Sequence, residues 1–328
     1  MTEIDHWHPV ARRGSLRRKP LAVRICGREV VLFRIADGTP GALEDRCPHR
    51  RMRLSKGAVA GDRLVCPYHG WSYERSGAGE SPGTPKLHAC AEHYDVEERH
   101  GAIWLRAAGS KAAFPELRTD GHERICTLEN VFAAPLETVL DNFTEVEHTA
   151  TTHLLFGYSS EDMPKVETRV EATDDAVRVS NKGPQKPIPR VVEWITGARS
   201  GDVFTDDWTT RFSPVHAIYD QWWQDPATGA ARPDRLLVYV FLTPITDAET
   251  LVFTFAFTSP PGGRFVRNRL IKAIIRRVVA HEVNLDQRMI ANLADPRPQL
   301  VGMQLGRFDK ALGENRMRIE RIYRGREG

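Results

Sequence analysis

The sequence of 328 residues lacks any segment suited to crossing a membrane. Spanning a bilayer takes about 20 consecutive apolar residues, and the best apolar run, residues 236–242, is far shorter. Residues 1–10 carry acids and histidines where a secretion signal has lysines followed by an apolar run. We therefore expect a soluble, cytoplasmic protein with no membrane partner.

The chain also has little excess charge and few cysteines. Its 46 Lys and Arg residues against 43 Asp and Glu residues leave a net charge of +3, too small to predict a nucleic-acid partner. Five cysteines, an odd number, do not suit a framework of disulfides and favour a reducing compartment. The remaining composition is that of a globular protein, and a length of 328 residues predicts two domains at about 150 residues each.

Two patterns divide the chain near residue 110, and together they predict an α+β protein. Residues 1–110 contain short β-branched runs at 21–34 (a hairpin), 63–66, 94–97 and 103–106, which predict an all-β domain. Residues 111–328 contain alternating segments typical of an antiparallel sheet, at 166–172, 177–180, 204–212, 236–242 and 251–258. Apolar residues at helical spacing predict helices at 134–152, 264–293 and 314–324.

Cys47, His49, Cys66 and His69 form the first group of candidate ligands. The pairs C-x-H and C-x-x-H are separated by sixteen residues, and each pair supplies one thiolate and one imidazole. Zinc fingers usually keep their cysteines together and their histidines together, although a structural zinc site remains an alternative. One Cys and one His from each half suits a [2Fe-2S] cluster in which one iron takes both cysteines and the other takes both histidines.

This motif, with the H-G-W sequence at its end, resembles the Rieske domain of the Rieske non-haem iron oxygenases. The resemblance extends over about residues 7–105 and continues in the motif N-x-x-E-x-x-H-x4-H, formed by Asn142, Glu145, His148 and His153. It implies a second domain of helix-grip type with an antiparallel sheet and long helices. A His-x4-His pair alone is a weak signal, because two histidines near a helix end are more often ordinary hydrogen-bonded residues.

The resemblance implies that His148 and His153 are ligands of a mononuclear Fe(II). On an ideal helix Glu145 and His148 lie about 60° apart, and His153 is too far round to share their face, so the helix must end or distort before it. By family position Glu145 is a carboxylate bridging to His69 of a neighbouring subunit. Asn142 matches a residue near the iron in some members, and Asp141 is a competing candidate.

The third ligand is expected on the predicted helix 264–293, where Glu282 and Asp286 project within the apolar stripe. A carboxylate there is costly unless it is paired or binds a metal, the alternative being a rotated helix with both groups in solvent. Resemblance to the family's L-D-x-x-x-I segment makes Asp286 the ligand. Glu282 is left with an open role as a hydrogen-bonding or salt-bridge partner.

The resemblance further implies a homotrimer that uses O2 and receives electrons from a ferredoxin or flavin reductase. The loop at 77–83 lacks dinucleotide-binding spacing, so NAD(P)H is expected to act only through that reductase. A basic loop is either a docking surface for an acidic partner or simply solvated; it holds Arg46, Arg50, Arg51, Arg53 and Lys56.

The expected reaction is monooxygenation, by hydroxylation or by O- or N-demethylation, of a small aromatic or polycyclic substrate. The alternatives are a cis-dihydroxylating arene dioxygenase and, in a different class, a Rieske electron-transfer protein without catalysis. Five aromatic residues are either the lining of a substrate pocket or plain core: Trp194, Trp208, Trp222, Trp223 and Phe241.

Overall fold

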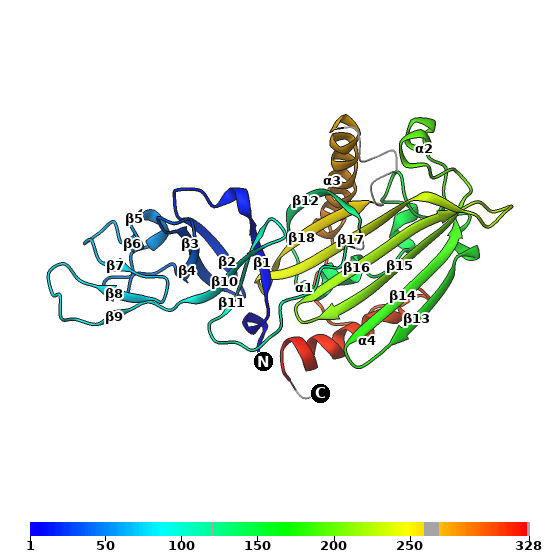
Figure 1. Cartoon of the computed structure of the whole chain (residues 1–328). Coiled ribbons are helices and arrows are strands. Elements are labelled where there is room, and N and C mark those ends of the chain that lie inside the picture. The colour runs from blue at the N-terminus through cyan, green and yellow to red at the C-terminus, as the bar shows by residue number, and fades with distance from the viewer. Residues whose placement is uncertain (120, 259–268, 327–328) are drawn as a thin grey trace. The chain divides into compact units, whose positions relative to one another are not determined.

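The computed structural model describes residues 1–119, 121–258 and 269–326 (Figure 1). The chain divides into two compact units. The first comprises Met1–Pro115 and Thr243–Asp247, and the second comprises Glu116–Leu242 and Ala248–Gly328. No helix within the described ranges combines the length and the apolar character needed to cross a bilayer.

The first unit is built from three antiparallel sheets, as expected for an all-β domain. Their strand orders are β1 (His8–Arg12), β11 (Ala102–Ala107), β10 (Tyr94–Arg99); β2 (Leu21–Ile25), β3 (Arg28–Arg34), β4 (Pro40–Glu44); and β5 (Ala58–Ala60), β6 (Arg63–Val65), β7 (Ser72–Tyr73), β8 (Ala78–Glu80), β9 (Ala89–Cys90). Three short 3-10 helices accompany them: η1 (Glu3–Asp5), η2 (Arg13–Ser15) and η3 (Leu54–Lys56).

The hairpin predicted at 21–34 is confirmed as β2 and β3, which pair from Leu21 opposite Leu32 to Ile25 opposite Arg28. Cys26 and Gly27 form the turn, and both have positive φ angles, 47° and 72°. Such two-residue turns match the twist of the strands that they join.

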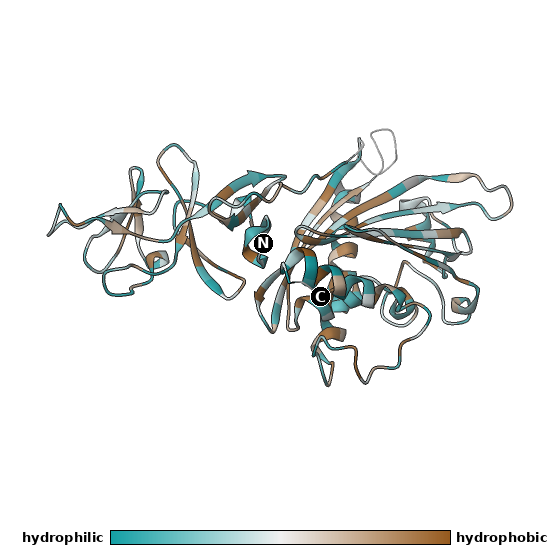
Figure 2. Ribbon diagram, turned by 90° about the horizontal axis from the view of Figure 1, so that it is seen from below, coloured by the Kyte–Doolittle hydropathy of each residue, from teal (hydrophilic) through white to brown (hydrophobic). Residues whose placement is uncertain are grey.

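The second unit contains one antiparallel sheet of seven strands. Its order is β12 (Glu123–Phe132), β18 (Glu249–Thr258), β17 (Ala231–Thr246), β16 (Val215–Gln224), β15 (Val203–Phe212), β14 (Ala176–Pro184) and β13 (Glu167–Ala172). All five predicted segments are strands, whereas β12 and β16 were not predicted. Hydrophobic and hydrophilic segments are both present along the strands of this sheet (Figure 2). Burial does not simply alternate, because β15 and β18 are buried over most of their length.

Helices pack against this sheet and complete the core. The helical elements are α1 (Leu136–Asn142), η4 (Glu147–Ala150), η5 (Met163–Lys165), α2 (Arg190–Thr196), α3 (Arg269–Ala291), α4 (Lys310–Arg318) and the π-helical turn η6 (Ile319–Tyr323). α3 contacts β12, α1 contacts β18, and α4 contacts β13 and β14. The long and terminal helices were therefore predicted correctly in type. Residues 264–268 of the long one lie outside the described residues.

The helix predicted over residues 134–152 is wrong in length, because α1 ends at Asn142. The hydroxyl of Thr144 turns back to the carbonyl of Leu140 at 2.8 Å, and the hydroxyl of Tyr219 on β16 donates to the carbonyl of Phe143. These bonds replace the helical ones that would continue the ladder. Glu145 therefore lies outside any helix and His148 lies in η4, so the angles of an ideal helix do not apply to them.

Candidate metal centres

Two tight loops of the first unit hold Cys47 and Cys66. The amide of Cys47, after β4, donates to the carbonyl of Met52 at 2.8 Å, and the amide of Cys66, after β6, donates to that of Trp71 at 2.7 Å. Both cysteines are buried, with 1% and 2% of their surface exposed. The hydroxyl of Tyr73 lies 3.1 Å from Sγ of Cys47. The loops therefore hold both sulfurs against the core.

The imidazoles of the same loops are exposed and lie beside each other. The ring centroids of His49 and His69 are 4.5 Å apart, and His49 stacks on Trp71 at 4.6 Å. Among the described residues, no three of the four ligand candidates bring their ligand atoms within 4.8 Å of one another, as a single ion would require. Buried sulfurs and outward imidazoles suit a two-iron cluster, whose cysteine and histidine pairs bind different irons, better than one zinc ion.

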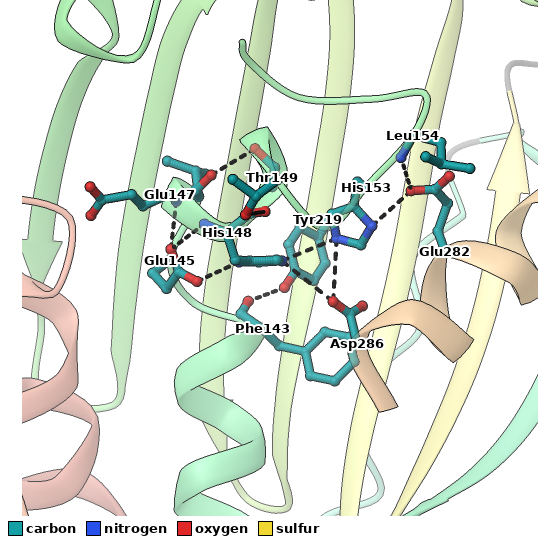
Figure 3. Close-up of polar contacts among 12 residues, drawn as sticks. Phe143, Glu145, Glu147, His148, Thr149, His153, Leu154, Tyr219, Glu282 and Asp286 are labelled. Atoms are coloured by element: carbon teal, nitrogen blue, oxygen red, sulfur yellow. Dashed lines mark hydrogen bonds and ion pairs between the residues drawn. The ribbon is translucent and has the colours of Figure 1, made fainter. Parts of the chain in front are cut away.

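Three side chains of the second unit converge on one point (Figure 3). Nε2 of His148 lies 3.0 Å from Nε2 of His153, and Oδ1 of Asp286 lies 3.4 Å and 3.3 Å from these two nitrogens. Asp286 is buried, and its Oδ1 receives no hydrogen bond from the described residues. Two imidazoles and one carboxylate are the ligand set of a non-haem Fe(II) site. The donors present therefore fit a mononuclear iron.

The backbone after α1 places both histidines. His148 lies in η4, and its carbonyl accepts the amides of Thr151 and Thr152 at 3.1 Å and 2.8 Å, so the chain turns sharply before His153. The buried ammonium group of Lys186 donates to the carbonyls of Thr149 and His153 at 2.7 Å and 2.5 Å. Burial lowers the pKa of Lys186. This lysine ties the two ends of the turn together.

A carboxylate stands behind each histidine. Glu145 bonds Nδ1 of His148 and also accepts the amide of Glu147 at 2.5 Å. Oε2 of Glu282 lies 2.7 Å from Nδ1 of His153. A carboxylate on Nδ1 fixes the ring and leaves Nε2 free for a metal. The structure thus gives Glu282 the role that the sequence left open.

The local charge favours a bound cation. Burial alone would lower the pKa of His148, but the neighbouring carboxylates of Asp286 and Glu145 outweigh burial and raise the pKa to about 10. With Glu282, three carboxylates surround two imidazoles, so a positive charge between the rings is strongly stabilised. A divalent ion supplies that charge while both rings stay neutral.

Asn142 and Asp141 point in different directions at the end of α1. Asn142 lines a cavity beside the three ligands, and its buried Nδ2 has no partner among the described residues. Asp141 instead pairs with Arg316 of α4 at 2.5 Å. Burial raises the pKa of Asp141 to about 6 despite that guanidinium. Asp141 therefore does not compete with Asn142 for a place near the metal.

The cavity beside the metal ligands has a volume of about 160 Å³. Aliphatic side chains of β17 and α3, with Phe156 and Phe204, form an apolar part of its wall: Leu236, Val238, Val240, Val278, Val279 and Val283. None of the five aromatic residues named in the sequence lines it. Trp208, Trp223 and Phe241 are buried core, and Trp194 is exposed, so the pocket interpretation of these five residues is wrong.

The sequence reasoning missed Asp206 and Gln221, which line the same cavity. Residues alternate between the two faces of a strand. Asp206 therefore shares its face with Phe204 and Trp208, a polar residue in an apolar series. An acidic residue on the apolar face of a predicted strand was therefore the signal in the sequence that could have identified Asp206.

Comparison with known proteins identifies both domains. Residues 6–94 match the Rieske [2Fe-2S] domain, and residues 132–322 match the vanillate O-demethylase oxygenase C-terminal domain. This pair of domains is that of the Rieske oxygenases.

The individual relatives of this chain include demethylases and monooxygenases. Methylxanthine N1-demethylase NdmA of Pseudomonas putida is 35% identical over 45% of this chain, a match that spans only 46% of the relative's length. The 4beta-methylsterol monooxygenase of Methylococcus capsulatus is 38% identical over 78% of this chain and 69% of its own. Dicamba monooxygenase bound to dicamba shares the fold, with a TM-score of 0.79 at 19% identity over 98% of this chain and 97% of that one. The chain belongs to the Rieske oxygenase alpha subunits, among relatives that are monooxygenases and demethylases.

Proposed function

We propose that this chain is a terminal oxygenase that inserts one oxygen atom from O2 into a small organic substrate, by hydroxylation or oxidative demethylation. The observation that carries the proposal is the convergence of His148, His153 and Asp286 beside a cavity in the same unit. This convergence gives the second unit a chemical task, which a Rieske electron-transfer protein without catalysis would not need.

Two sets of residues would hold the metals. Cys47, His49, Cys66 and His69 would hold the [2Fe-2S] cluster, and the convergent triad would hold Fe(II). When bound, these groups supply single-electron transfer and the reduction of O2.

The chain's own residues prepare the site. Glu145 and Glu282 hold the two imidazoles with Nε2 directed inward, while Lys186 fixes the turn that carries them. The aliphatic wall of the cavity keeps water from the reacting carbon.

Glu145 would also connect two copies of the chain. We place it as the bridge to His69 of a neighbouring copy in a head-to-tail homotrimer. Its position supports this role, because one carboxylate oxygen already bonds His148 and 16% of the side chain remains exposed.

Electrons would come from a ferredoxin or flavin reductase that oxidises NAD(P)H, and the basic loop beside the cluster is the proposed docking surface. The structure shows which cations of this loop are already paired within the chain. Arg46 pairs with Glu44 at 2.8 Å, and Arg53 pairs with Glu29 at 3.2 Å. Arg50, Arg51 and Lys56 form no ion pair within the described part of the chain, and they are the cations available to an acidic partner.

The test combines metal analysis with isotope labelling. We expect three irons and two sulfides per chain, a Rieske EPR signal on reduction, and one atom of ¹⁸O from ¹⁸O2 in the oxidised product or in the released aldehyde. Two labelled atoms in a diol would show the dioxygenase. A cluster signal without mononuclear iron would show an electron-transfer protein, and zinc without iron would exclude all three.

A further inference from the structure

The wall of the cavity contains one carboxylate, that of Asp206, that has no role in the metal site. It lies on β15, opposite Gln221 of β16. Aromatic pairs flank this polar pair: Phe204 packs on Trp223 with ring centroids 5.0 Å apart, and Trp208 packs on Tyr219 at 5.6 Å. The polar pair is thus a single hydrophilic row in an apolar surface.

The carboxylate of Asp206 has few hydrogen-bond or ion-pair partners for a buried group. Only 6% of the residue is exposed, and Nε2 of Gln221 donates to Oδ1 at 2.9 Å. No Lys or Arg among the described residues pairs with it. The nearby hydroxyl of Tyr219 donates to the carbonyl of Phe143 instead. Because a buried carboxylate without enough donors is costly, the cavity at Asp206 is suited to a donor brought by a ligand.

The rest of the cavity wall carries no positive side chain to oppose this carboxylate. None of the lining residues is Lys or Arg within the described ranges, and the lining includes Glu145, Glu282 and Asp286 as well as Asp206. The nearest lysine, Lys186, directs its ammonium group to backbone carbonyls. Even with a divalent ion at His148, His153 and Asp286, the four carboxylates of the lining leave the cavity with a net negative charge, which disfavours an anionic substrate.

The volume limits the size of the occupant. A dry aliphatic cavity of about 150 Å³ accommodates one benzene molecule, and this cavity holds about 160 Å³. The cavity therefore has room for one small ring, whose faces would contact the aliphatic side chains of β17 and α3.

Building on the proposed function, we infer that the substrate is a single-ring molecule, neutral or cationic, whose N–H or O–H group donates to Asp206. Carboxylate substrates are rejected. The ring lies in the aliphatic part of the cavity and the carbon to be oxidised faces His148, His153 and Asp286. Gln221 positions the carboxylate that receives the donor.

Four probes with one ring and one methoxy group test this inference: 4-methoxybenzylamine, 4-methoxybenzyl alcohol, 4-methoxytoluene and 4-methoxybenzoate. Dissociation constants are measured by calorimetry on the anaerobic, metal-loaded full chain at pH 8. We expect the amine to bind most tightly, then the alcohol, then the toluene, with the benzoate at least about a hundredfold weaker than the amine.

Asp206→Asn supplies the second arm, because it keeps the shape and removes the charge. It should weaken amine binding by about tenfold or more and change toluene binding by less than about threefold. Asp207→Asn is the matched control: its carboxylate pairs with Arg178 at 2.6 Å on the other face of β15, so the order of the probes should not change.

Three results would overturn the inference: benzoate binding as tight as amine binding, amine binding unchanged in Asp206→Asn, or no binding of any probe. The order of the four probes on the unaltered protein needs no variant, so poor folding of a variant leaves the test intact. Failure of the proposed function would appear separately, as missing mononuclear iron or missing O2 uptake.

Discussion

Glu282 is placed to orient His153, and replacing it should weaken metal binding. Its Oε2 lies 2.7 Å from Nδ1 of His153 and accepts the amide of Leu154 at 3.3 Å. Glu282 also precedes Asp286 by one helical turn on α3, so one face of this helix supplies both a ligand and the partner of another ligand. Glu282→Gln keeps the size of the side chain but removes its charge.

The size of the effect follows from what Gln retains. Losing the partner of a metal-binding histidine typically lowers metal affinity by about 10- to 100-fold, or roughly 1.4 to 2.8 kcal/mol. The amide oxygen of Gln can stay beside Nδ1 of His153, and Lys186 still holds the carbonyl of His153. We therefore expect about a tenfold loss for Glu282→Gln and about a hundredfold loss for Glu282→Ala.

The assay is competition for Co(II) between a chelator and protein whose mononuclear site has been emptied. Glu147→Gln is the control, because it makes the same charge change at an exposed residue beside His148. Affinity within twofold of the unaltered protein in Glu282→Ala, or an equal loss in Glu147→Gln, would refute the assigned role.

Three further predictions address the bridge, the turn and the core. Glu145→Gln should keep its cluster and weaken the mononuclear site about tenfold, as Glu282→Gln does, because it also removes the charge behind a ligand histidine. With that site fully loaded with iron, it should still lose substrate-dependent O2 uptake; normal uptake would argue against the bridge. Gly157→Ala places a Cβ 2.6 Å from Oγ1 of Thr149 at a φ of +111°, and should cost about 1–3 kcal/mol in urea unfolding. Gly109→Ala, with φ +75° and open space, should cost less. Burial lowers the pKa of His216 from 6.5 to about 4. Between pH 6.5 and 4 the imidazole of His216 binds a proton in the unfolded chain but not in the folded chain. The free energy of unfolding therefore falls by up to roughly 3 kcal/mol as the pH is lowered through this range. His216→Phe should reduce that loss, and equal urea midpoint shifts between pH 7 and 4.5 in both proteins would contradict it.

The candidate ligands of the cluster stand out in the sequence because they lie in two short local motifs. Pro48, Pro67 and Gly70, which lie in or beside these motifs, also indicate tight loops. The triad was predictable only in part: His148 and His153 are close in sequence, whereas the break in α1 depends on Tyr219, which is 76 residues from Phe143. Phe143 and Val146, two of the apolar residues whose spacing predicted the helix 134–152, are both buried in the core. Their spacing could not show that the chain between them leaves the helix.

The two carboxylates behind the histidines show where sequence reasoning ends. Glu145 is three residues from His148, so its partner lies within one motif, but Glu282 is separated from Leu154 by 128 residues. What the sequence did show is that Glu282 and Asp286 share an apolar face of one helix. Two carboxylates on such a face need two separate partners, and the structure supplies them on the same short turn: His153 for Glu282, and the space between both imidazoles for Asp286. A displacement of α3 would therefore remove a ligand and misorient a second one together, which makes the packing of this helix against β12 part of the metal site.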